Sequence, residues 1–160
     1  MEIRIRKAQV SDVNEIIKFI RELAIYEKLE HEMLATPELI RKNLFGERAF
    51  AEVVFLETNG GKAGFALFFH NYSTFLGKPG IYLEDLFVMP EHRGKGYGKR
   101  LLVYLARLAV ERDCGRLEWS VLDWNTPAIE FYKSLGAVSM SEWTANRLTG
   151  QALKDVAAMS

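Results

Sequence analysis

The sequence is poor in cysteine. Cys114 is the only one among 160 residues, so no disulfide can form within the chain, and a cysteine-rich zinc site is excluded. This usage is typical of a reducing compartment and predicts a cytoplasmic protein. Cys114 lies at the expected end of a helix, where packing is a simpler interpretation than nucleophilic catalysis.

Net charge is also absent, because 21 lysines and arginines balance 21 aspartates and glutamates. A neutral chain has no long-range field that would attract nucleic acid or an anionic membrane, so we expect neither as a partner. No apolar run reaches the roughly 20 residues that span a bilayer. The charged start, residues 1–6, lacks the apolar core of a secretory signal. The three histidines, His31, His70 and His92, have no metal-site spacing, and no metal is predicted.

The composition is that of an ordinary globular domain, with 49% hydrophobic and 26% charged residues. A chain of 160 residues has the size of one domain with one core. No linker, repeat or low-complexity segment divides it, so we predict a single domain over residues 1–160.

The spacing of apolar residues predicts alternating strands and helices. We expect strands at residues 3–8, 49–57, 63–72, 81–88 and 116–122, and a weaker one after Gly136. We expect helices from a Ser11 cap to about Glu27, from Thr36-Pro37 to Gly46, from the glycine-rich stretch near residue 97 to about Gly115, from an Asn125 cap to Gly136, and in a short tail after Gly150. Asn59-Gly60-Gly61 predicts a hairpin. This order indicates an α/β fold with an antiparallel start and one parallel crossover.

The strongest local signal is the glycine loop Arg93-Gly94-Lys95-Gly96-Tyr97-Gly98, which precedes a helix. Backbone N–H groups at a helix start lack intrahelical partners and bind anions. Lys99 and Arg100 follow in the first turn, where cations are unfavourable unless an anion is bound. The P-loop pattern fails because Arg100 replaces serine or threonine, and the dinucleotide pattern fails because residue 99 is lysine. A tight strand-to-helix turn with a solvated basic rim is the alternative.

The same loop matches the Gln/Arg-x-x-Gly-x-Gly/Ala motif of the GNAT acetyltransferase superfamily. Three further stretches resemble the diamine (spermidine/spermine) N-acetyltransferases of that superfamily: Glu22-Leu23-Ala24-Ile25-Tyr26-Glu27, Tyr82-Leu83-Glu84-Asp85-Leu86-Phe87-Val88-Met89, and Trp124-Asn125-Thr126-Pro127-Ala128-Ile129-Glu130-Phe131-Tyr132-Lys133. The resemblance runs in order over about residues 3–140 and weakens after Met140. It implies the GNAT fold, a mixed central sheet splayed at the cofactor site, with flanking helices.

The resemblance also implies acetyl-CoA as the co-substrate, a homodimer, and a set of binding residues. The backbone of Leu86, Phe87 and Val88 would pair with the pantetheine arm. The pyrophosphate would lie on the glycine loop, formed by Arg93, Gly94, Lys95, Gly96, Tyr97, Gly98 and Lys99. The rest of the cofactor site would be Asn125, Thr126, Pro127, Ala128 and Tyr132.

Acetylation of an amine needs acid–base groups. An alkylamine is mostly protonated at neutral pH, so a base must take its proton before it attacks a thioester. Family correspondence gives Glu84 this base or substrate-binding role, with a structural carboxylate as the alternative. It gives Tyr132 the role of general acid, although residue type alone would favour a core tyrosine. Strand alternation turns Asp85 to the opposite face from Glu84 and favours a structural role for it. Tyr26 and Glu27 line the amine site by resemblance, with a solvated helix end as the alternative.

Together these observations predict direct transfer of acetyl from acetyl-CoA to a primary amine of a small substrate, namely a polyamine, a diamine or a lysine-like amino acid. Two alternatives stay open: an acetyltransferase for protein or peptide amines, and a non-catalytic acyl-CoA-binding regulatory module. The presence of both Glu84 and Tyr132 argues against the module. A long polyamine should favour an acidic channel, yet the chain is neutral, and after Met140 only Glu142 lies near an acidic position that the family resemblance implies.

Overall fold

The computed structural model describes residues 2–160 and divides the chain into two compact units, one up to Leu122 and one from Asp123 to Ser160. Division into two compact units does not test the expectation of a single domain, which stays a prediction. Each unit is described by itself. No helix within residues 2–160 is both long enough and apolar enough to cross a membrane.

The first unit is built on one five-stranded sheet in the order β1-β2-β3-β4-β5. Its first four strands are antiparallel neighbours, and the last is parallel to β4. The strands are β1 (Arg4–Lys7), β2 (Glu52–Thr58), β3 (Gly61–Ser73), β4 (Lys78–Val88) and β5 (Leu117–Trp119). The antiparallel start and the single parallel crossover predicted from the sequence are therefore confirmed.

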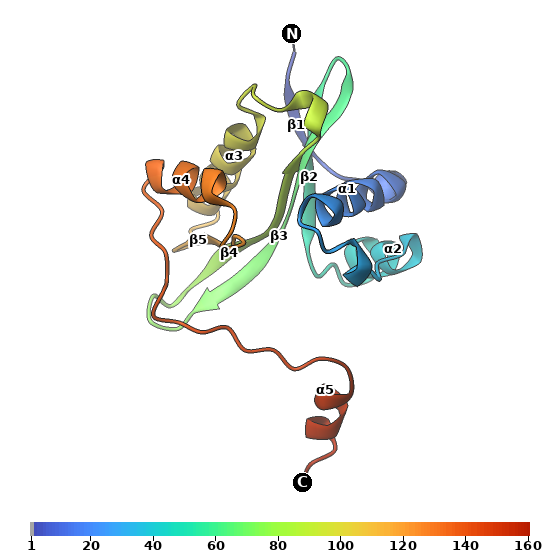
Figure 1. The fold of residues 1–160 in the computed structure, drawn as a ribbon, viewed down its shortest axis with the longest axis vertical. Helices are drawn as coiled ribbons and strands as arrows, with labels where there is room; N and C mark the ends of the chain where they lie inside the picture. Colours follow the sequence, from blue (N-terminus) through green and yellow to red (C-terminus); the bar gives the residue numbers. More distant parts are fainter. Residues whose placement is uncertain (1) are drawn as a thin grey trace. The chain divides into compact units, whose positions relative to one another are not determined.

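Helices cover both faces of this sheet. Figure 1 shows α1 (Val13–Tyr26) and α2 (Pro37–Phe45) on one face and α3 (Tyr97–Glu111) on the other. Three short 3-10 turns complete the unit: η1 (Val10–Asp12), η2 (Glu30–Glu32) and η3 (Pro90–His92). Because α3 connects β4 to β5, it is the crossover helix of the parallel pair.

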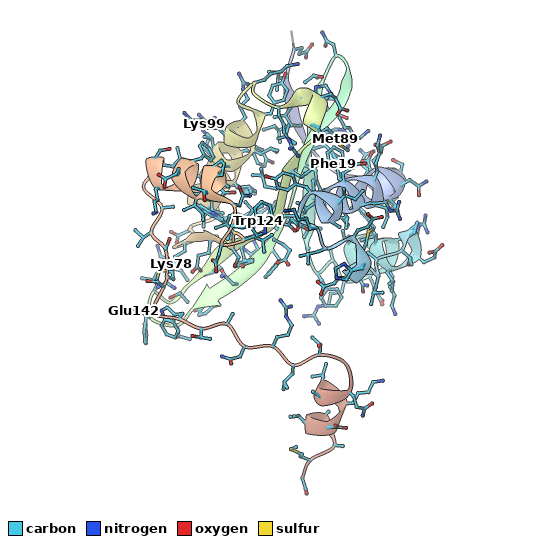
Figure 2. All side chains as sticks on the ribbon, viewed as in Figure 1. Phe19, Lys78, Met89, Lys99, Trp124 and Glu142 are labelled. Carbon is cyan, nitrogen blue, oxygen red and sulfur yellow. The ribbon has the colours of Figure 1, made fainter. Side chains whose placement is uncertain are left out.

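An aromatic cluster fills the space between α1, α2 and the sheet. The ring centroid of Phe19 lies 5.7 Å from that of Phe55 and 5.0 Å from that of Phe65. Phe87 and Met89 belong to the same buried cluster, and Figure 2 shows Phe19 pointing from α1 toward the strands. The cluster thus assigns Phe87 of β4 to the α1 face of the sheet.

Caps define where the helices begin. Thr36 accepts a hydrogen bond from the Leu39 amide (3.2 Å) at the start of α2, as predicted. The predicted Ser11 cap is wrong, because Ser11 lies inside η1 and Asp12 is the residue before α1. The Asp12 carboxylate accepts from the Gln9 amide at 2.8 Å, so the longer acid reaches back over the 3-10 turn.

The second unit contains two helices, α4 (Thr126–Ser134) and α5 (Gly150–Ala157). Asn125 caps α4 by accepting from the Ala128 amide at 3.4 Å, and the short tail helix after Gly150 is also confirmed. The strand predicted after Gly136 is wrong, since residues 135–149 form neither helix nor strand. A strand needs a neighbouring edge, and the apolar residues of this segment do not specify one.

Candidate active site

β4 carries an interruption at the centre of its ladder with β3. Leu67 lies opposite Asp85, whereas the next residue, Phe68, lies opposite Leu83, so Glu84 has no partner on β3. Such a bulge places two residues of one strand against one of the other and breaks the alternation of faces. The argument that put Glu84 and Asp85 on opposite faces therefore fails at this point.

The other edge of β4 opens at the same place. β5 pairs with β4 only from Ile81 to Leu83, opposite Leu117 to Trp119. Beyond Leu83, no strand within residues 2–160 pairs with this edge of β4. The backbone of residues 84–88 on the side away from β3 is called the open edge below. This divergence of β4 and β5 is the splay predicted from the resemblance.

Three acidic side chains gather beside the open edge: Glu84 and Asp85 of β4, and Glu27 at the end of α1. Burial and the negative charges of Glu84 and Glu27 raise the pKa of Asp85 to about 7. Burial and the charge of Glu84 also raise the pKa of Glu27. None of the three forms an ion pair with a lysine, arginine or histidine within residues 2–160. We call Glu27, Glu84 and Asp85 the carboxylate group.

The carboxylate group can attract a cation and can accept a proton near neutral pH, because an acid titrating near 7 is partly protonated there. In the described part of the chain, no three histidine, cysteine, aspartate or glutamate side chains are placed to hold a metal ion. The prediction from the sequence gave Glu84 a functional role and favoured a structural role for Asp85. Two adjacent acids in a buried strand were the signal that could have indicated both.

The glycine loop leads from β4 into α3. Gly94 and Gly96 both have φ of 79°, a left-handed conformation that favours glycine, and a Cβ on either would meet no atom within 4 Å. The space over these glycines is therefore open. The first turn of α3 contains no acid, and Lys99 and Arg100 are exposed. The loop thus fits a bound anion, as the pyrophosphate of acetyl-CoA would be.

The side chain of Arg93, the first residue of the loop, turns back to β4. Its Nε donates a hydrogen bond to the Val88 carbonyl at 2.9 Å. Its guanidinium carbon lies 4.8 Å from the centroid of the Tyr26 ring and 4.9 Å from that of Phe87. The two rings are 6.0 Å apart in an edge-to-face arrangement. Arg93 thereby joins the loop, the open edge and the end of α1.

The remaining predicted site residues lie on α4, in the second unit. Asn125 is its cap, Thr126, Pro127 and Ala128 form its first turn, and Tyr132 follows about one turn after Ala128. The rings of Phe131 and Tyr132 are 5.6 Å apart. The structure thus brings together Tyr26, Phe87 and Arg93, and separately the carboxylate group; the roles expected for the α4 residues stay predictions.

Comparisons with known proteins agree on one family. Residues 15–137 match the acetyltransferase (GNAT) family. The chain is 38% identical to a thialysine N-epsilon-acetyltransferase of Mus musculus, over 96% of each chain. It is 31% identical to a spermidine/spermine N(1)-acetyltransferase-like protein of Homo sapiens, over 96% of this chain and 24% of that protein. An integron cassette protein from V. cholerae has a similar structure, with a TM-score of 0.83, 27% identity and 99% of each chain covered.

Proposed function

The chain belongs to the acetyltransferase (GNAT) family, and on that premise we propose that it acetylates the terminal amine of a lysine-like amino acid or a short diamine. The resemblance noted in the sequence is confirmed, the fold is the GNAT fold, and the protein is an N-acetyltransferase of small amines. The relative from Mus musculus is named for thialysine, which favours a lysine-like acceptor over a long polyamine.

One observation carries this proposal: the bulge at Glu84 lies where the open edge begins and beside the carboxylate group. A strand edge without a partner can pair with an extended ligand, as in strand addition. The carboxylate group next to it can receive a cationic amine. The two halves of an acetyl transfer, an extended donor and a cationic acceptor, therefore meet on five consecutive residues of β4.

Acetyl-CoA, when bound, supplies an acetyl group activated as a thioester. The chain's own part is to hold it: the backbone of Leu86, Phe87 and Val88 would pair with the pantetheine arm, and residues 93–99 would bind the pyrophosphate. The open space over Gly94 and Gly96 and the absence of acids in the first turn of α3 support the second assignment. Asn125 and the first residues of α4, Thr126 to Ala128, would complete this site.

The carboxylate group would bind the acceptor as its ammonium form and then take its proton. The negative charge of Glu84 is one of the causes that raise the pKa of Asp85 to about 7, after burial. A carboxylate with a pKa of about 7, as Asp85 has, can accept a proton from the amine at neutral pH. The Tyr132 phenol would donate a proton to the leaving thiolate, which closes the proton balance of the transfer. No acyl-enzyme is needed.

The resemblance also supports a homodimer in the cytoplasm, and we include both in the proposal. The assembly is tested by light scattering, where a mass close to twice the 18.3 kDa of one chain is expected. A mass of one chain would remove the dimer without affecting the proposed reaction.

The decisive experiment measures thiol release from acetyl-CoA across a panel of amines: thialysine, lysine, a diamine, spermidine, spermine and a lysine-containing peptide. We expect the highest kcat/KM with thialysine or the diamine. The highest value with the peptide would instead indicate a protein-directed enzyme. Binding of acetyl-CoA without turnover of any amine would indicate a non-catalytic module and contradict the proposal.

A further inference from the structure

Arg93 makes three contacts that together span the candidate site. It begins the glycine loop, its Nε donates to the Val88 carbonyl at 2.9 Å, and its guanidinium lies against the Tyr26 and Phe87 rings at 4.8 and 4.9 Å. The side chain is exposed at its outer face. A cation that served only to bind phosphate would not need to be directed away from the loop in this way.

The Val88 carbonyl that Arg93 contacts belongs to the open edge. The Phe87 carbonyl oxygen lies 3.2 Å from the point that a Cβ would occupy if Gly64 on β3 had one, so this carbonyl points toward β3. Successive carbonyls of a strand point to opposite edges, and the Val88 carbonyl therefore points away from β3. Arg93 crosses this edge and reaches the α1 face, where Phe87 is buried.

Tyr26 is the last residue of α1, and Glu27 of the carboxylate group follows it directly. The helix ends in a tight backbone motif, with the Leu29 amide bonded to the Ala24 carbonyl (2.8 Å) and the Lys28 amide to the Ile25 carbonyl (3.1 Å). Lys28 takes φ of 62° to close it, a conformation that favours glycine. This motif fixes the backbone between residues 26 and 28, so Glu27 has a set place relative to the end of α1. The contacts of the Tyr26 ring with Phe87 and Arg93 hold that helix end against β4.

We propose that Arg93 is a positioning residue for the amine site: by holding Tyr26 against Phe87 it keeps Glu27 beside Asp85 and ties the amine site to the cofactor loop. This inference rests on the proposed function, and it assigns the Arg93 side chain to the amine half of the site. The backbone of Arg93 stays available for the pyrophosphate. The guanidinium suits the task because it is planar, stacks on rings and donates from Nε at the same time.

The test compares Arg93→Met with Lys95→Met, a matched removal of one cation two residues further along the same loop. We expect Arg93→Met to raise the KM for the amine about ten-fold, from the loss of two ring contacts and one hydrogen bond, with less than about two-fold change in the KM for acetyl-CoA. Lys95→Met should instead raise the KM for acetyl-CoA and leave the KM for the amine unchanged. Tyr26→Leu combined with Arg93→Met should be no worse than the poorer single variant.

A second readout is the pH profile of kcat/KM. The charges that act on Asp85 come from Glu84 on β4 and Glu27 on α1, so release of Glu27 should move the acidic limb of the profile to lower pH. Lys95→Met should leave that limb in place. Arg93→Lys keeps the charge but not the planar donor. We expect it, like Arg93→Met, to raise the KM for the amine with little change in the KM for acetyl-CoA. This variant preserves the test if Arg93→Met does not fold.

The inference is overturned if Arg93→Met, like Lys95→Met, raises only the KM for acetyl-CoA. Arg93 would then act as a phosphate-binding cation in the same way as Lys95. An unchanged acidic limb in Arg93→Lys together with an unchanged KM for the amine would overturn it equally. Absence of turnover in the unaltered protein with every amine is a different result, because it contradicts the proposed function itself.

Discussion

Replacement of Asp85 by asparagine should stabilise the protein at alkaline pH while lowering its activity. Burial, together with the charges of Glu84 and Glu27, raises the pKa of Asp85 from 3.8 to about 7. Above pH 7 the folded protein therefore contains an ionised carboxylate in a place that disfavours its charge. Asparagine has nearly the same shape and no charge, so the substitution removes the penalty with little change in packing.

The size and the pH window of this effect follow from the two pKa values. A rise from 3.8 to about 7, at 1.36 kcal/mol for each pKa unit, corresponds to about 4 kcal/mol as an upper value. The folded state binds more protons than the unfolded chain between these two values, so stability falls as pH rises through this window. The penalty is absent below about pH 4 and complete above about pH 7.

Urea unfolding at pH 4, 6 and 8 measures the effect directly. The free energy of unfolding of Asp85→Asn, minus that of the unaltered protein, should grow with pH and reach up to about 4 kcal/mol at pH 8. Glu91→Gln, which alters an exposed carboxylate in η3, is the matched control and should give a small difference at all three pH values. A difference for Asp85→Asn that stays flat from pH 4 to 8 would refute the reasoning.

Three further predictions test other parts of the molecule. Glu84→Gln should shift the acidic limb of kcat/KM to lower pH, because its charge helps to raise the pKa of Asp85; an unmoved limb would mean that the pair does not govern catalysis. Asp12→Asn should lower the free energy of unfolding by about 2 kcal/mol at pH 7, because the hydrogen-bonded Arg6 guanidinium lowers the pKa of Asp12 from 3.8 to about 2. That difference should disappear between about pH 5 and pH 2 in urea titrations, as the folded Asp12 takes up its proton. Tyr132→Phe should reduce kcat by more than about ten-fold with an unchanged Kd for acetyl-CoA by calorimetry, and full activity would remove its acid role.

Most features that depend on short stretches of sequence were predicted, and the Ser11 cap is an exception. Thr36-Pro37 and Asn125 begin helices because cap chemistry involves only three or four neighbouring residues. The turn at Asn59-Gly60-Gly61 joins β2 and β3 for the same reason. The glycine loop precedes α3, and its two left-handed glycines lie within the motif that suggested the resemblance. In each case the physical cause lies within the segment itself.

The pairing directions of the strands were predicted, but the details that depend on the register with a partner strand were not. The bulge at Glu84 exists only in the register of β4 against β3, and no periodicity within residues 81–88 signals it. The predicted strand 116–122 is shorter, Leu117–Trp119, because β4 leaves β5 after Leu83. The direction of the Arg93 side chain was also not predicted from the sequence, because the Tyr26 ring that it contacts lies 67 positions earlier.

The bulge also explains why a destabilising acid is placed in an otherwise apolar strand. Without it, the side chains of Asp85 and Glu84 would point to opposite faces of the sheet. With it, the charge of the exposed Glu84 acts on the half-buried Asp85 and adds to the effect of burial in raising the pKa of Asp85. The stability lost in this way is a property of the protein without amine, because an ammonium group bound to the carboxylate group would relieve the same repulsion. A site that is strained by its own charge until a cation enters it binds cationic amines in preference to neutral ones, and this selectivity would be lost together with the strain in Asp85→Asn.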